Sequence, residues 1–231
     1  MIELDAVKKR DKGMPMNEKV DGTGMEVVAV TPGMVEEVTG VLVEAFKGEE
    51  TTNYHLDMKN PSTPRRMAVV DGIYVRLYLE AGRPVLAAVN NGRVTGVGMV
   101  RDPRIHISRR RAVSFIARNL HHILALYGRR PIHGLRILRA VRQPRGLTKP
   151  YFTFEALGVH PDHQGKGAGR ALMRAVQASL EGEQRISGIY LSTGSEKNRA
   201  FYERLGYDTL RVDDLGEVKV YHLFWQNPTF G

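Results

Sequence analysis

A glycine-rich stretch is the clearest sign of chemistry in this sequence. Gly165, Gly167 and Gly169 fill three of five consecutive positions, between an apolar segment that ends at Val159 and a helical pattern that begins near Arg170. Glycines leave backbone N–H groups uncovered by side chains, and a helix start carries the positive end of the helix dipole. The stretch therefore predicts a phosphate-binding turn between a strand and a helix.

The spacing excludes two common phosphate-binding motifs. A dinucleotide fingerprint, G-x-G-x-x-G, would have a residue other than glycine at its third glycine in either register. An ATP-type loop needs glycine where this chain has His160, and Ser or Thr where it has Gly167. What remains is Gln-x-x-Gly-x-Gly, at Gln164, Gly167 and Gly169.

This pattern, together with a downstream segment that reads Asn-Arg-Ala-Phe-Tyr from Asn198 to Tyr202, resembles the GNAT superfamily of acetyl-CoA-dependent N-acetyltransferases. Within that superfamily, the chain is similar to the branch that contains puromycin acetyltransferase, most densely over residues 151–212. The resemblance implies one GNAT-like α/β domain. It also implies transfer of an acetyl group from acetyl-CoA to a primary amine by direct attack in a ternary complex, with a small molecule as acceptor.

The resemblance further implies where the coenzyme binds. Backbone groups of the strand before the turn would hold the pantetheine arm, and the turn's amides would hold the pyrophosphate. Gly158 permits a bulge that opens the strand edge, although it could instead serve only to pack closely against a helix. The expected cofactor-binding residues are Leu157, Gly158, Val159, Gln164, Gly165, Lys166, Gly167, Ala168, Gly169, Arg170 and Asn198.

Two residues are the candidates for proton transfer. By the resemblance, Tyr202 is the acid that protonates the departing thiolate, although it could simply pack beside Phe201. Glu155 is the candidate base, because it lies within an apolar strand where burial would raise its pKa; a structural ion pair with a nearby arginine is the alternative. Asn198 precedes Tyr202 by four residues and so shares its helical face.

Hydrophobic periodicity predicts a mixed, mostly antiparallel sheet flanked by helices. Asn91-Gly92, between two apolar runs, predicts a hairpin turn. We expect a basic helical pair, residues 103–149, inserted before the fourth strand. The expected strands are 26–30, 84–90, 93–100, 151–159, 188–193, 207–212 and 218–225, and the expected helices are 32–46, 65–79, 113–127, 131–144, 170–180 and 196–205.

The positive charge is concentrated in this inserted pair. Residues 101–149 contain thirteen Lys or Arg and one acid, within a chain of net charge +9. Such a cluster attracts phosphates, acidic substrates, nucleic acid or anionic lipid, but it is also compatible with a solvated helical face. Few aromatic residues interleave with it, which disfavours nucleic-acid binding. We expect the pair and residues 46–55 to wall the acceptor pocket. A CoA-binding regulatory module without turnover is the other alternative.

Composition sets the remaining limits. With 42% hydrophobic and 26% charged residues, the 231-residue chain is typical of a folded soluble protein. Cysteine is absent, which excludes thiol catalysis and disulfides; we also predict no metal site at His160 and His163. No signal-like or membrane-spanning segment is evident, so we predict a cytoplasmic location. We expect residues 1–24 to form a flexible arm before a 25–231 domain, and leave a homodimer open.

Overall fold

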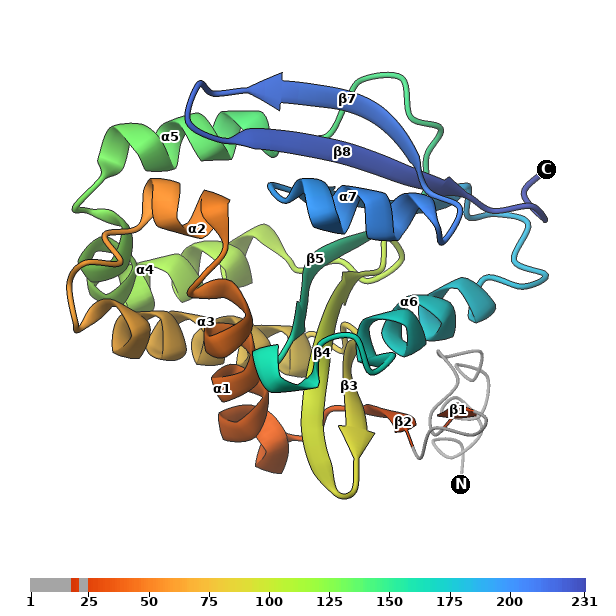
Figure 1. Ribbon diagram of the computed structural model, residues 1–231, viewed down its shortest axis with the longest axis horizontal. Coiled ribbons are helices and arrows are strands. Elements are labelled where there is room, and N and C mark those ends of the chain that lie inside the picture. Colours follow the sequence, from red (N-terminus) through yellow and green to blue (C-terminus); the bar gives the residue numbers. More distant parts are fainter. Residues whose placement is uncertain (1–17, 21–24) are drawn as a thin grey trace.

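The computed structural model describes residues 18–20 and 25–231 (Figure 1). The strands are β1 (Glu18–Val20), β2 (Met25–Ala29), β3 (Val85–Asn90), β4 (Arg93–Arg101), β5 (Phe152–Val159), β6 (Gly188–Thr193), β7 (Asp208–Asp214) and β8 (Lys219–Gln226). The α-helices are α1 (Val35–Phe46), α2 (Glu50–His55), α3 (Thr63–Glu80), α4 (Arg109–Tyr127), α5 (Pro131–Ala140), α6 (Ala168–Ala178) and α7 (Glu196–Glu203). Short 3₁₀ turns span Pro32–Met34 and Pro161–His163.

Over these residues the strands form one sheet in the order β1-β2-β3-β4-β5-β6-β8-β7. Every neighbouring pair is antiparallel except β5 and β6, which are parallel. The predicted mixed, mostly antiparallel α/β fold is therefore confirmed. The hairpin turn between β3 and β4 is also where it was predicted, with positive φ at both Asn91 (50°) and Gly92 (74°), as a type I′ turn requires.

Two apolar cores cover opposite faces of the sheet. Leu86 and Ala88 of β3 pack in the core that includes α6, whereas Ala87 between them packs in the core that includes α1 and α3. This alternation follows from the two-residue period of a strand. Figure 1 accordingly shows α6 and the pair of α1 and α3 on different sides of the central strands. The sheet is therefore covered on both faces where β5 crosses its centre.

Two predictions near the N-terminus need correction. Residues 18–20, expected in a flexible arm, form β1 and pair with β2, so the inserted helices precede the fifth strand of the sheet rather than the fourth. The rest of the expected arm lies outside the described residues. Helix α2 was not predicted, because residues 48–63 have no apolar periodicity. No helix in the described part of the chain combines the length and hydropathy needed to cross a bilayer.

Asp71, on α3, offers a test of this packing. Burial raises the pKa of its carboxyl from 3.8 to about 7. In the folded protein this carboxyl therefore keeps its proton up to about pH 7, whereas in the unfolded chain it loses the proton near pH 4. Between these two pH values the unfolded chain gains the free energy of ionisation and the folded protein does not, so the free energy of unfolding falls as the pH rises. Asp71→Asn should raise the free energy of unfolding by about 2 kcal/mol at pH 8, or roughly 4–8 °C in Tm, with a gain that shrinks toward pH 4.

Thermal melts across that pH range check the expectation. Asp208→Asn, at an exposed position on β7, removes the same charge and is the control. A gain from Asp71→Asn that did not change with pH would mean that this carboxyl is not held protonated by the fold.

Candidate functional site

The central feature of the site is a split between β5 and β6. These strands pair only at Phe152–Ile189 and Thr153–Tyr190, and then diverge. On its other side β5 stays paired with β4 to Val159. From residue 155 to 159, one edge of β5 therefore has backbone N–H and C=O groups that pair with no strand in the described part of the chain, as expected for an opened edge.

A bulge accompanies this opening, but it does not lie at Gly158, where it was predicted. The register with β4 moves from Met99–Ala156 to Val100–Phe154, which makes Glu155 the extra residue. Gly158 has the alternative role: a Cβ there would lie 3.0 Å from the Cβ of Ala45, so glycine lets α1 pack against the strand.

The predicted phosphate-binding turn follows this strand. Gly165 (φ 77°) and Gly167 (φ 96°) adopt left-handed conformations, and Gly167 caps α6. Within the described residues, no protein acceptor takes the backbone N–H groups of residues 165–170. Gln164 donates from Nε2 to the backbone oxygen of Val159 (3.4 Å), which ties the turn to β5. The turn thus presents successive free amides at the start of an eleven-residue helix.

A cavity of about 170 Å³ lies in the split between the strands. It brings together residues from β5, β6, α7, α5 and the segment before α2. Its polar lining includes Glu49, Thr52, Glu155, Ser192, Asn198 and Tyr202. Leu157 of the predicted pantetheine-binding strand also lines it. The cavity therefore joins the open strand edge to both predicted catalytic residues.

Tyr202 is a buried tyrosine at the wall of this cavity, with 6% of its surface exposed. Its ring contacts those of Phe201 and Tyr207, at centroid distances of 5.4 and 6.1 Å. Burial raises the pKa of its hydroxyl, and the charge of Glu49 raises it further. Asn198 lines the same cavity one turn earlier on α7, whose first turn is capped by Ser195 Oγ, bonded to the Asn198 N–H (3.3 Å). The two side chains share one helical face, as their spacing predicted.

Residues 118–209 match the family model of the acetyltransferase (GNAT) domain. The whole fold agrees with this match. A protein from Corynebacterium glutamicum, described as histone acetyltransferase HPA2 and related acetyltransferase, superposes with a TM-score of 0.61 over 86% of this chain and 93% of its own, at 17% identity. The chain has a GNAT-like fold. The predicted fold class is therefore confirmed.

Two further solved structures share this GNAT-like fold. The yncA protein from Salmonella typhimurium, solved with its cofactor acetyl-CoA, has a TM-score of 0.51 and 16% identity, over 88% of this chain and 94% of its own. The ribosomal-protein-S18-alanine N-acetyltransferase from Escherichia coli has a TM-score of 0.51 and 12% identity, over 90% and 96%. At these identities the likeness is one of fold.

Within the GNAT-like fold, Glu155 does not have the environment that was predicted. Its side chain is 40% exposed rather than buried, and its Oε1 lies 2.8 Å from Nε of Arg101. The bulge accounts for the difference, because Glu155 is the extra residue and has no partner opposite it on β4 to hold its side chain in the alternation of the strand. Glu155 still lines the cavity, now as half of an ion pair.

Glu49 is the acidic residue in the cavity that the sequence analysis missed. Its Oε2 accepts hydrogen bonds from the N–H (2.9 Å) and Oγ1 (3.2 Å) of Thr52, and from Oγ1 of Thr51. It thereby caps α2, which fixes the carboxylate at the cavity. The signal in the sequence is weak, because glutamate is an uncommon N-cap and no apolar stripe marks the short helix.

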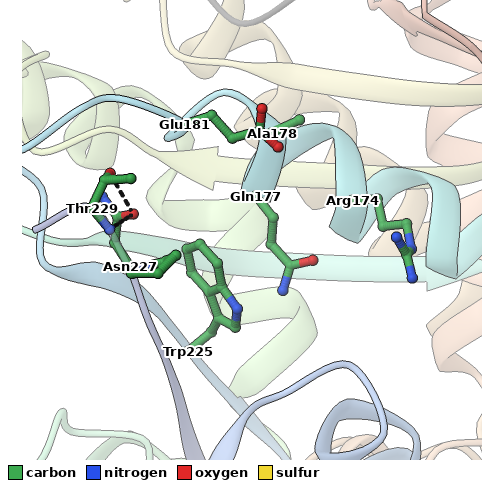
Figure 2. Close-up of a pocket in the computed structure, with 8 residues that line it drawn as sticks. Arg174, Gln177, Ala178, Glu181, Trp225, Asn227 and Thr229 are labelled. Carbon is green, nitrogen blue, oxygen red and sulfur yellow. Dashed lines mark hydrogen bonds between the residues drawn. The ribbon is translucent and has the colours of Figure 1, made fainter.

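A larger cavity of about 370 Å³ lies elsewhere, between α6 and the end of β8 (Figure 2). Two of its polar side chains, Gln177 and Asn227, bind backbone groups within the protein. Asn227 donates to the backbone oxygens of Glu183 and Ile186, and Gln177 donates to that of Leu205. None of the predicted site residues lines it. We therefore place the candidate site in the split between β5 and β6.

Proposed function

We propose that this protein transfers an acetyl group from acetyl-CoA to a primary amine by direct attack in a ternary complex. The observation that carries the proposal is the meeting, at one cavity, of an unpaired strand edge and a buried tyrosine, beside a turn of free backbone amides. Membership of the puromycin acetyltransferase-like branch and a small-molecule acceptor remain part of the proposal.

The residues present fit the coenzyme's polar groups. Backbone groups of Leu157, Gly158 and Val159 would bind the amides of the pantetheine arm, because the pairing of β5 with β6 ends at Thr153 and leaves this edge open among the described strands. The amides of residues 165–170 would hold the pyrophosphate, with the dipole of α6 adding to the attraction. The side chain of Asn198 would orient the arm inside the cavity.

Tyr202 would act as the acid. The amine nitrogen forms a bond to the thioester carbonyl carbon, the carbon–sulfur bond breaks, and the hydroxyl of Tyr202 gives its proton to the departing sulfur. The proton that the nitrogen sheds as it becomes an amide returns to the oxygen of Tyr202, directly or through water. Its raised pKa keeps the proton on oxygen until negative charge develops on sulfur in the same desolvated cavity.

The acceptor also needs a base, since an alkyl ammonium must lose a proton before its nitrogen can attack. Glu155 was predicted for this role and lines the cavity, but its carboxylate is already paired with Arg101. Glu49 has no cationic partner among the described residues. We therefore propose that Glu49 binds the acceptor ammonium and accepts its proton, directly or through water, with Glu155 adding negative charge.

The apolar part of the cavity suggests what the acceptor carries besides its amine. Phe46, Ile137, Val141, Leu191 and Val220 line the same space as the two carboxylates. Ile137 lies on α5 and Val141 directly follows it, so one helix of the inserted pair lines this cavity. These surroundings suit a small amine with an apolar body.

Thiol release from acetyl-CoA, measured over a panel of small amines and peptides, tests the proposal. Release should depend on the amine. Glu49→Gln should lower kcat/KM roughly 10- to 100-fold, the cost of losing a charged contact, whereas Glu50→Gln, at the exposed next position, should change it little. A larger loss from Glu155→Gln than from Glu49→Gln would return the role of base to Glu155. Coenzyme binding without release for any amine would indicate a regulatory module instead.

A further inference from the structure

Helix α4 has two apolar faces, and only one of them is packed. Phe115 and Leu126 are buried against the rest of the protein. The second set comprises four large aliphatic side chains that are each between 46% and 59% exposed. They are Val113, Ile116, Leu120 and Leu124.

These four side chains form one continuous stripe. At 100° per residue they fall within an arc of about 80°, centred roughly 130° from the packed face. The helix has 19 residues, so the stripe runs along most of a rod of about 28 Å. On α5, the next helix of the inserted pair, Ile132, Leu135 and Leu138 are also exposed. A helix that only covered the core would have polar residues at these positions.

The charges around the stripe have one sign. From residue 103 to 149 the sequence contains no Asp or Glu. Arg111 pairs with Glu80 of α3, but Arg109, Arg110 and Arg118 have no carboxylate partner within the described residues. On the helix, Arg109 falls within the arc of the stripe and Arg110 lies beside it, whereas Arg118 lies on the far side of the helix from the stripe. Uncompensated cations therefore border exposed aliphatic side chains.

We propose that the α4 stripe binds an anionic lipid surface, with α4 lying in the plane of the interface. Aliphatic side chains would enter the headgroup region while the bordering arginines contact acidic headgroups, as in interfacial amphipathic helices. A second copy of the chain would bring like charges opposite one another across the stripe. A nucleic acid would bind the arginines and leave the aliphatic side chains in water. The charge pattern and the apolar pattern together fit the lipid surface.

Vesicle co-sedimentation with the full chain tests the proposal. Vesicles of phosphatidylcholine with about one third phosphatidylglycerol should sediment the protein, and vesicles of phosphatidylcholine alone should do so at least tenfold more weakly. The double substitution L120E and L124E should weaken partition to the anionic vesicles at least tenfold. The matched control is L210E with V212E, which alters two similarly exposed apolar side chains on β7 and should leave partition unchanged.

Several results would overturn the assignment. Equal loss in the α4 and β7 variants would show that added negative charge alone weakens binding. A concentration-dependent dimer that L120E and L124E separate would assign the stripe to a second copy. Binding to duplex DNA without binding to vesicles would assign the arginines to nucleic acid. Melting curves would check that both variants fold, as their exposed positions lead us to expect.

Discussion

Tyr202→Phe is expected to lower kcat by about 10²- to 10⁴-fold, the usual contribution of a positioned acid. The substitution removes one oxygen from a side chain whose ring contacts those of Phe201 and Tyr207, so the cavity should keep its shape. The KM for acetyl-CoA should change little, because the backbone of β5 and of the turn supplies the binding groups. Steady-state kinetics with a productive amine would measure both constants.

Tyr207→Phe is the matched control for this substitution. Tyr207 is equally buried beside Tyr202, and its hydroxyl has no hydrogen-bond partner within the described structure. Its removal should leave kcat unchanged and stabilise the fold slightly, since it relieves a buried unpaired polar group. Because burial raises the pKa of Tyr202, the wild-type rate should also show no loss from this group up to pH 10. If Tyr202→Phe matched its control, another group would be the acid.

Gly167→Val is expected to raise the dissociation constant of CoA about 100-fold. Gly167 has φ of 96°, a conformation that costs a β-branched residue about 1–2 kcal/mol, and its amide lies within the series that would hold the pyrophosphate. If the change removes two hydrogen bonds from backbone amides to the charged pyrophosphate, at about 1.5 kcal/mol each, the dissociation constant rises by about this 100-fold factor. Calorimetric titration with CoA, together with thermal melts in its presence and absence, would measure the change.

Gly216→Val separates backbone strain from loss of binding. Gly216 has φ of 89° in an exposed turn between β7 and β8, and, as at Gly167, no atom lies within 4 Å of an added Cβ. Both variants should lose similar stability, while only Gly167→Val should lose the rise in Tm that CoA produces. Equal CoA affinity in the two variants would contradict a pyrophosphate site at this turn.

The features that the sequence predicted correctly depend on local chemistry. Asn91-Gly92 makes its turn because these two residues tolerate positive φ, whatever the strands pack against. The glycines at 165 and 167 take left-handed conformations for the same reason, and they lie directly before a helix with a regular apolar face. The sheet, the turn and the helix with Tyr202 could therefore be predicted without tertiary contacts.

The incorrect predictions depend on contacts between distant segments. Whether residue 155 or 158 forms the bulge is decided by how β5 aligns with Met99 and Val100 of β4, and by the close approach of α1. Glu155 becomes exposed as a result, although its neighbours are apolar in sequence. Glu49 reaches the cavity only because α2 folds back toward β5 and β6, and a six-residue helix leaves little periodicity to detect.

The short parallel pairing of β5 and β6 also affects how strongly the two parts of the sheet are connected. Within the described residues, five strands on one side and three on the other are joined in the sheet by two residue pairs, Phe152–Ile189 and Thr153–Tyr190. The arm of a bound coenzyme, hydrogen-bonded along the free edge of β5, would fill the split between β5 and β6. Because residues of both β5 and β6 line the cavity, an arm bound there would contact both parts of the sheet and restrain their relative motion.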